Sequence, residues 1–456
     1  MSVPTATSHV GHSTFGQTLF NSIAILLGIG MLSEPLAFHY AGWIGGTVLN
    51  VLYGAITCYT AKILGRIILA DPRLRSYSDI GRKAFGPRAT LLISLLFCLE
   101  LFSVAVILVT LYADSLHSII PEMSANAYKL WGLLILIPTV FLPLSLLSYT
   151  SILGILSTVF LVLVLFVDGL TKKEAPGSLW SPAHTELGVG NYRQLGVAFG
   201  LFMAGFSGHA VIPSLVRDMQ DPTEFESMLN YAFVVATAIY TIIGYAGYLM
   251  FGADVSEEIS LDLLRTPGYP KQLNQIALWS LVIAPLSKFA LTTQPLNATL
   301  EMLAGLAPHI GSPEDVANKP RTLAGALPRA KHLRARSLRS VCSRPAARHA
   351  YAVAQRVAVT VLAVLVSIAV PEFSAMMAFL GAFSAFMLCV IGPVAAKLAL
   401  VRAGKMPGAT AQGTTSQGKA GKVWARVEGA MDVGLIVMAV AMAAWGTAAA
   451  FLENEA

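Results

Sequence analysis

Three ionisable side chains, Glu34, Glu100 and Lys288, lie inside long apolar stretches of the sequence. A charged group at the middle of a bilayer costs roughly 2.5–3.5 kcal/mol on insertion scales, so side chains in such places mark proton relays and ion pathways. Burial in an apolar cavity also tunes a carboxyl group to take up and release a proton near the working pH. We therefore expect these three residues to couple proton movement to function, with Glu34 as the leading proton carrier.

Two of the apolar stretches contain a glycine five residues before a proline. Gly30 precedes Pro35 in the first stretch, and Gly208 precedes Pro213 in the sixth. Proline has no amide hydrogen, so the carbonyl group four residues earlier loses its helical partner, and glycine makes local unwinding cheap. Such irregular backbone persists inside a membrane only where it is buried in protein or lines a watered cavity. We expect a broken helix at each position.

The two breaks together predict a site for a zwitterion. The half-helix that starts after each break offers free amide groups to an anion, and the carbonyl groups on the other side suit an ammonium group. The alternative is that these glycines and prolines only allow close packing and kinks. His209 either contributes to pH dependence or packs as a neutral side chain. The predicted substrate-binding residues are Gly28, Ile29, Gly30, Met31, Gly205, Phe206, Ser207, Gly208 and His209.

The elements that position these residues are expected to be membrane-spanning helices. Charged residues make up only 12% of the 456 residues and apolar types make up 55%, which is typical of a polytopic membrane protein. Broken spans at positions one and six of the series indicate an inverted five-plus-five repeat, with one further helix after it. Hydropathy predicts eleven spans: 15–41, 43–69, 88–113, 129–147, 151–170, 194–216, 228–251, 272–300, 351–371, 373–400 and 427–451.

The basic residues predict the orientation of the chain. With a cytosolic N-terminus, 24 of the 31 Lys and Arg residues fall on the cytosolic side and six on the other, in agreement with the positive-inside rule. The C-terminus then lies on the opposite side of the membrane. The expected parts are a cytosolic tail 1–14, a first repeat 15–170, a second repeat 194–402 with a basic cytosolic loop 302–350, a cytosolic linker 403–426 and a last span 427–451.

The residues around both breaks resemble the amino acid/auxin permease family and, within it, the fungal vacuolar amino acid transporters. The likeness rests on Asn21 to Trp43, Gly205 to Met219, Pro285 to Leu291 and Gly381 to Pro393. It implies a leucine-transporter-type fold with eleven helices and proton-coupled amino acid transport, by symport or antiport. It also implies a vacuolar membrane, with the plasma membrane as the alternative.

Within that fold, two of the buried charges have more than one interpretation. Lys288 either replaces the sodium ion that sodium-coupled relatives hold between the first and eighth spans, or forms an ion pair with Glu34 or Glu100. Glu34 either carries a proton or is a static partner of the backbone amides that the first break frees. For Glu100, an internal ion pair is favoured over a role in proton coupling.

Other classes of function fit the sequence less well. An enzyme needs a nucleophile, a base or a metal cluster, and the sequence has no His-x-x-x-His, Cys-x-x-Cys or Gly-x-Ser-x-Gly pattern. We therefore expect no catalytic activity, no metal, no cofactor and no nucleic-acid partner. The expected partners are an amino acid substrate, protons and the lipid bilayer. The alternative function is an amino-acid-sensing transceptor on the same fold, which binds amino acids and signals through its tails.

Overall fold

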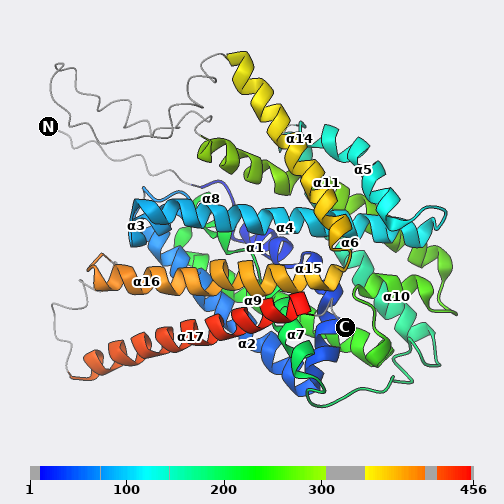
Figure 1. Ribbon diagram of the computed structural model, residues 1–456. Coiled ribbons are helices and arrows are strands. Elements are labelled where there is room, and N and C mark those ends of the chain that lie inside the picture. Colours follow the sequence, from blue (N-terminus) through cyan, green and yellow to red (C-terminus); the bar gives the residue numbers. More distant parts are fainter. Residues whose placement is uncertain (1–10, 72, 143, 305–344, 406–418, 453–456) are drawn as a thin grey trace.

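The computed structural model describes residues 11–71, 73–142, 144–304, 345–405 and 419–452, and these are almost entirely helical (Figure 1). Nine helices within these ranges are long and apolar enough to cross a membrane. The predicted class, an all-α protein with many membrane-spanning helices, is confirmed. Most of the predicted basic loop 302–350 and of the linker 403–426 lies outside the described residues, as does most of the tail 1–14.

Most of the helices follow one another with short connections, and a longer connection without helix spans 172–191. The α-helices are α1 (Phe15–Leu26), α2 (Glu34–Ala70), α3 (Tyr77–Phe85), α4 (Pro87–Ile119), α5 (Ala125–Thr139), α6 (Leu144–Thr171), α7 (Tyr192–Gly205), α8 (Ile212–Asp218), α9 (Phe225–Phe251), α10 (Ile259–Arg265), α11 (Lys271–Leu303), α14 (Pro345–Ala369), α15 (Phe373–Phe379), α16 (Gly392–Arg402) and α17 (Lys419–Leu452). Shorter elements are the 3-10 helices η1 (Ile29–Ser33), η2 (His209–Val211), η3 (Pro222–Glu224) and η4 (Gly252–Asp254), and the π-helix η5 (Leu380–Ile391).

Both predicted helix breaks are confirmed. The first lies between α1 and α2 and contains η1, and the second lies between α7 and α8 and contains η2. Pro35 and Pro213 stand in the first turn of the α-helix that follows each break. A proline there costs no hydrogen bond, because the first amide groups of a helix have no partner inside the helix. The two prolines therefore start the second half-helices rather than kink a continuous one.

Two features explain why nine long helices are found where the sequence predicts eleven spans. Helix α2 has 37 residues, but Gly42 within it has φ 68° and ψ 172°, so the helix changes direction there. A Cβ atom on Gly42 would overlap the carbonyl group of Gly188, so only glycine fits this position. Helix α5 has 15 residues, which is shorter than the roughly 20 residues that cross a bilayer. The predicted first and second spans therefore share one long helix, and the predicted fourth span is too short to be counted among the nine.

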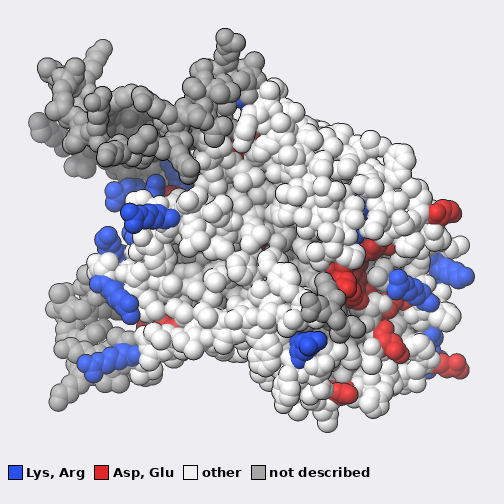
Figure 2. Space-filling view, in the orientation of Figure 1, with Lys and Arg blue, Asp and Glu red and all other residues white. Residues whose placement is uncertain are grey.

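The broken segments lie at the centre of the helix packing. Helix α2 packs on α7 and α9, helix α11 packs on α4 and α6, and η1 contacts α7 and α9. The charges are distributed unevenly along the molecule. Figure 2 shows Lys and Arg side chains at the end that carries α3 and α16, whereas most of the visible Asp and Glu side chains gather at the opposite end, near α10. This arrangement agrees with the charge asymmetry that the sequence predicts.

Candidate functional site

The two breaks contact each other through a pair of glycines. A Cβ atom on Gly30 would lie 2.6 Å from the Cα atom of Gly205, so Gly30 has no room for a larger residue unless the breaks move apart. The hydroxyl group of Tyr240, on α9, lies 2.8 Å from the carbonyl oxygen of Gly205 and also hydrogen-bonds the carbonyl oxygen of Leu26. These carbonyl groups end α7 and α1, where helical partners are missing. Tyr240 thus joins the two broken helices.

A cavity of about 450 Å³ lies beside this contact. Its volume falls within the roughly 300–1,000 Å³ that is usual for small-molecule sites. Both breaks line it, and the structure thus brings together six of the nine predicted substrate-binding residues. These six are Gly28, Ile29, Gly30, Gly205, Ser207 and Gly208.

The other three predicted residues lie behind the cavity wall. Met31 and Phe206 are buried, and the ring of Phe206 packs edge-on against Tyr240. His209 is buried as well, with Nε2 at 2.9 Å from the Thr60 hydroxyl oxygen. The same nitrogen lies 3.0 Å from the Thr57 carbonyl oxygen. The imidazole is therefore tied to α2 and does not line this cavity.

The far wall of the cavity consists of apolar side chains that the sequence analysis did not single out. They come mainly from α4 and include Phe97, Leu101, Val104 and Leu108. Apolar residues in a membrane helix look alike in sequence whether they face lipid, a neighbouring helix or a cavity. Tyr240 was missed for the same reason, because an aromatic residue in a span usually serves packing.

Two of the three ionisable residues in the spans line this cavity. Glu100 extends from α4 and Lys288 from α11, and the Glu100 Oε2 atom is buried without a hydrogen-bond partner in the described part of the chain. The Lys288 ammonium packs against Gly154 on α6, where a Cβ atom would lie 2.9 Å from Nζ. None of the ion pairs among the described residues joins Lys288 to Glu34 or Glu100.

Glu34 lies on the other side of the contact between the breaks. It is the first residue of α2 and is 1% exposed, and its Oε1 atom would lie 3.2 Å from a Cβ atom on Gly205. Neither carboxyl oxygen has a hydrogen-bond partner within the described ranges. An ionised carboxylate without a partner is strongly disfavoured in such surroundings, so this conformation suits the protonated acid.

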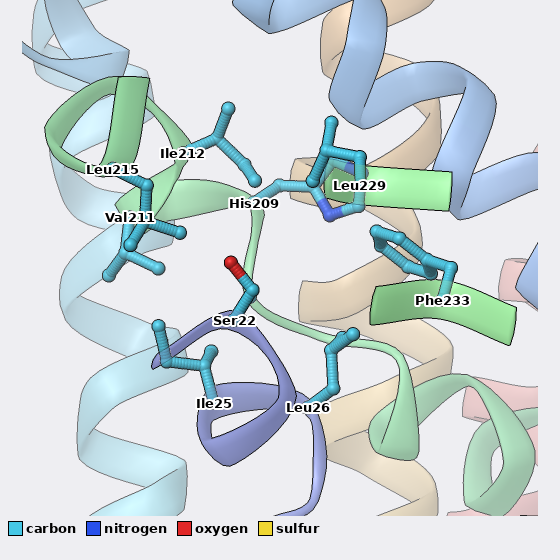
Figure 3. Close-up of a pocket in the computed structure, with 10 residues that line it drawn as sticks. Ser22, Ile25, Leu26, His209, Val211, Ile212, Leu215, Leu229 and Phe233 are labelled. Carbon is cyan, nitrogen blue, oxygen red and sulfur yellow. The ribbon is translucent and has the colours of Figure 1, made fainter. Parts of the chain in front are cut away.

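A second, much smaller pocket of about 20 Å³ lies at the sixth-span break (Figure 3). Side chains of α1, η2, α8 and α9 surround it, and Ser22 is the polar side chain of α1 in that wall. The Ser22 hydroxyl lies 3.4 Å from the sulfur atom of Met228. This space is enough for about one water molecule, so an amino acid does not fit here.

Comparison with solved structures finds a protein of similar fold. The chain superposes on a sodium-coupled sialic acid symporter with a TM-score of 0.50 and 12% sequence identity. The match covers 95% of this chain and 90% of the symporter. At this level of identity the match shows a shared fold only.

The sequence relationship is more specific. The profile of the family described as "Transmembrane amino acid transporter protein" matches residues 11–452, so the chain belongs to this family, the amino acid/auxin permease family. The chain is 30% identical over 403 residues to the Arabidopsis thaliana protein named amino acid transporter AVT1B, a match that covers 86% of this chain and 65% of that protein. It is 32% identical over 308 residues to amino acid transporter AVT1D of the same plant, a match that covers 64% of this chain and 53% of that protein.

These comparisons confirm the resemblance found in the sequence and place the chain among transporters rather than enzymes. The matched regions correspond to between about half and two thirds of the length of the two plant relatives.

Proposed function

We propose that the protein transports amino acids across a membrane by proton-coupled secondary active transport, with alternating access around the two broken helices. One observation carries this proposal: both breaks, the carboxyl group of Glu100 and the ammonium group of Lys288 line one cavity of amino-acid size. Membership of the amino acid transporter family supports the substrate class.

The breaks supply the groups that a zwitterion needs. The backbone from Gly28 to Gly30 and from Gly205 to Gly208 borders the cavity, and glycine leaves amide and carbonyl groups accessible to a ligand. The free ends of half-helices favour a carboxylate at one end and an ammonium group at the other. The substrate side chain then lies against the apolar wall of α4, which favours apolar amino acids.

Glu34 and Lys288 are the proposed coupling residues, with Glu100 as a further candidate. Lys288 lies between the first break and α6, since the small void beside its side chain is bordered by Gly28, Gly154 and Ser157. A fixed ammonium there replaces the cation of a sodium-coupled mechanism. Glu34 touches Gly205, so a change in the contact between the breaks changes its surroundings and thereby its proton affinity.

The proposed topology has eleven spans. The bend at Gly42 divides the predicted first and second spans, and the short α5 serves as the fourth. Repeats 15–170 and 194–402 then have opposite orientations, followed by the last span 427–451, with a cytosolic N-terminus. The family resemblance favours a vacuolar membrane.

Transport assays with the purified full chain in sealed vesicles test the proposal. We expect an imposed pH gradient to drive accumulation of labelled amino acids and to be dissipated by them. Glu34→Gln keeps the shape of the side chain but cannot release a proton. It should abolish gradient-driven accumulation while exchange of substrate continues, and Glu122→Gln, at an exposed loop position, serves as the matched control.

Three results would contradict the proposal or part of it. Accumulation that depends on sodium and ignores pH would exclude proton coupling. Full proton-driven accumulation by Glu34→Gln would remove Glu34 from the mechanism. Substrate binding without any movement across the membrane would favour the sensor.

A further inference from the structure

A second large cavity, of about 470 Å³, lies at the end of the molecule opposite the basic face. Its walls come from the region between α9 and α11, from the C-terminal part of α4, from α2 and from the start of α15. Leu36 and Tyr40 of α2 border it, and these residues follow directly after the first break. The cavity therefore stands near the break but is separate from the central site, with which it shares no lining residue.

Acidic side chains dominate the polar lining of this cavity. Asp114, Glu257, Glu258 and Glu372 face Arg265 and His117, so negative charges outnumber positive ones. Glu257 already has a structural role, because one of its carboxyl oxygens accepts a hydrogen bond at 2.9 Å from the Ser374 amide at the start of α15. The remaining acids lack such a bond to a helix end in the described ranges.

Glu258 is the residue that points to a ligand. Its side chain is 0% exposed, and its Oε1 atom has no hydrogen-bond partner in the described part of the chain. The other carboxyl oxygen accepts only a long hydrogen bond, of 3.4 Å, from the Ser260 hydroxyl. Leaving a buried carboxyl oxygen unpaired is costly, and a bound donor removes that cost.

The cation that fits is an organic ammonium group rather than a metal ion. Within the described residues, no group of three or more His, Cys, Asp and Glu side chains is arranged to hold a metal. The cavity is large enough for a molecule with several carbon atoms. None of the ion pairs in the described part of the chain uses Arg265, so its guanidinium is available for a carboxylate.

We propose that this cavity, lined by Glu258, Glu372, Asp114 and Arg265, is a second binding site that takes a basic amino acid. The ammonium group of the side chain binds Glu258 and its acidic neighbours, and the α-carboxylate binds Arg265. This assignment rests on the proposed function for its substrate class, but not on proton coupling or on transport itself.

Equilibrium binding of labelled L-lysine to the purified full chain in lipid nanodiscs, without any ion gradient, tests the proposal. L-norleucine is the matched ligand, because it has the same carbon skeleton as lysine without the side-chain ammonium group. We expect lysine to bind at least about tenfold more tightly than norleucine at this site. Glu258→Gln and Glu372→Gln should each weaken lysine binding about tenfold or more, since a charge-assisted hydrogen bond is lost.

Glu122→Gln, at an exposed acidic position that does not line the cavity, should leave lysine affinity unchanged. Because Glu372 is only partly buried, its variant keeps the test decisive if Glu258→Gln fails to fold. Labelled lysine that unlabelled norleucine displaces as well as unlabelled lysine does, or unchanged lysine affinity in a folded Glu258→Gln or Glu372→Gln variant, would overturn the proposal. The protein could bind lysine more weakly in these two variants and yet move no amino acid across the membrane. That result would support the second site and refute the proposed function.

Discussion

At the scale of single residues, the central site depends on how closely Gly30 and Gly205 approach each other. Gly30 Cα carries no side chain, and the space that a Cβ atom would occupy is filled by the backbone of Gly205. This contact brings the ends of two helices together at the edge of the cavity. The Tyr240 hydroxyl, with its single proton, lies within hydrogen-bonding distance of the last carbonyl group of each helix and so fixes the spacing. The geometry makes the contact sensitive to one added methyl group.

Gly30→Ala should therefore separate the breaks. We expect a destabilisation of about 1–3 kcal/mol, the usual cost of overpacking a well-packed site, together with a loss of substrate affinity. Thermal unfolding and substrate binding by the purified protein measure the two effects. Gly16→Ala is the control, because a Cβ atom on Gly16, in α1, meets no other atom within 4 Å. Equal behaviour of the two variants would mean that the contact between Gly30 and Gly205 does not matter.

Part of this site could be predicted from single residues. The positions of the breaks follow from Pro35 and Pro213, because the missing amide hydrogen acts on the local backbone and needs no knowledge of neighbouring helices. The partners of the ionisable residues could not be predicted. For Lys288 the sequence leaves open a cation position and an ion pair with an acid, and it does not predict the contact with Gly154 on α6. Which residue of another helix lies opposite depends on helix rotation, which hydropathy does not encode.

At the scale of elements, the C-terminal helix α17 is held by a buried ion network. Lys397, on α16, lies 2.6 Å from Glu428 and 2.7 Å from Asp432, both on α17. The Tyr59 hydroxyl of α2 lies 2.8 Å from the Lys397 ammonium and donates a hydrogen bond to Asp432 at 2.7 Å. Asp432 is 2% exposed. The network joins the last helix to two helices from different proposed repeats.

Removing the lysine should loosen α17. Lys397→Met leaves Asp432 buried without its cation, a change that typically costs about 3–5 kcal/mol. Arg66→Met is the matched control, since the ion pair of Arg66 with Glu226 is 51% and 42% exposed and such pairs contribute about 1 kcal/mol or less. Thermal unfolding in detergent measures both. A Lys397→Met variant as stable as Arg66→Met would show that the network does not anchor the helix.

The elements also show what sequence patterns leave out. The predicted tenth span is present as α15, η5 and α16, but its middle is a π-helix of 12 residues. A Cβ atom on Gly381, in that π-helix, would overlap the carbonyl group of Gly200 on α7. Such wide turns often occur at functional sites. Apolar composition predicts that a helix crosses the membrane, but the choice between α and π hydrogen bonding depends on this close tertiary contact.

At the scale of the whole molecule, charge divides the protein into two different ends. The basic end agrees with the predicted cytosolic face (Figure 2). The connection between α9 and α11 holds the buried acids Glu258 and Asp262. Burial raises the pKa of Asp262 from 3.8 to about 6, although hydrogen bonds from Ser256 and the charge of Arg265 oppose this shift. Burial and the nearby Asp114 and Glu257 also raise the pKa of Glu258.

These raised pKa values predict that Asp262 and Glu258 contribute more to the stability of the folded protein as the pH falls. A carboxyl group with a higher pKa in the folded state binds its proton more tightly there than in the unfolded chain. The free energy of unfolding therefore rises as the pH falls through about 6, and the gain from Asp262 is complete below its ordinary pKa of 3.8. Two units of pKa correspond to about 2–3 kcal/mol.

Thermal unfolding of the purified protein between neutral and mildly acidic pH measures this gain, and Asp262→Asn should remove part of it because an amide does not titrate. Glu122→Gln, at an exposed site, should keep the full dependence. An unfolding midpoint temperature of the wild-type protein that decreases as the pH is lowered would contradict this prediction. The same holds for an Asp262→Asn variant whose midpoint depends on pH as strongly as that of the wild-type protein. The distribution of Lys and Arg residues predicts that this end of the protein, which holds Asp262, lies on the non-cytosolic side of the membrane.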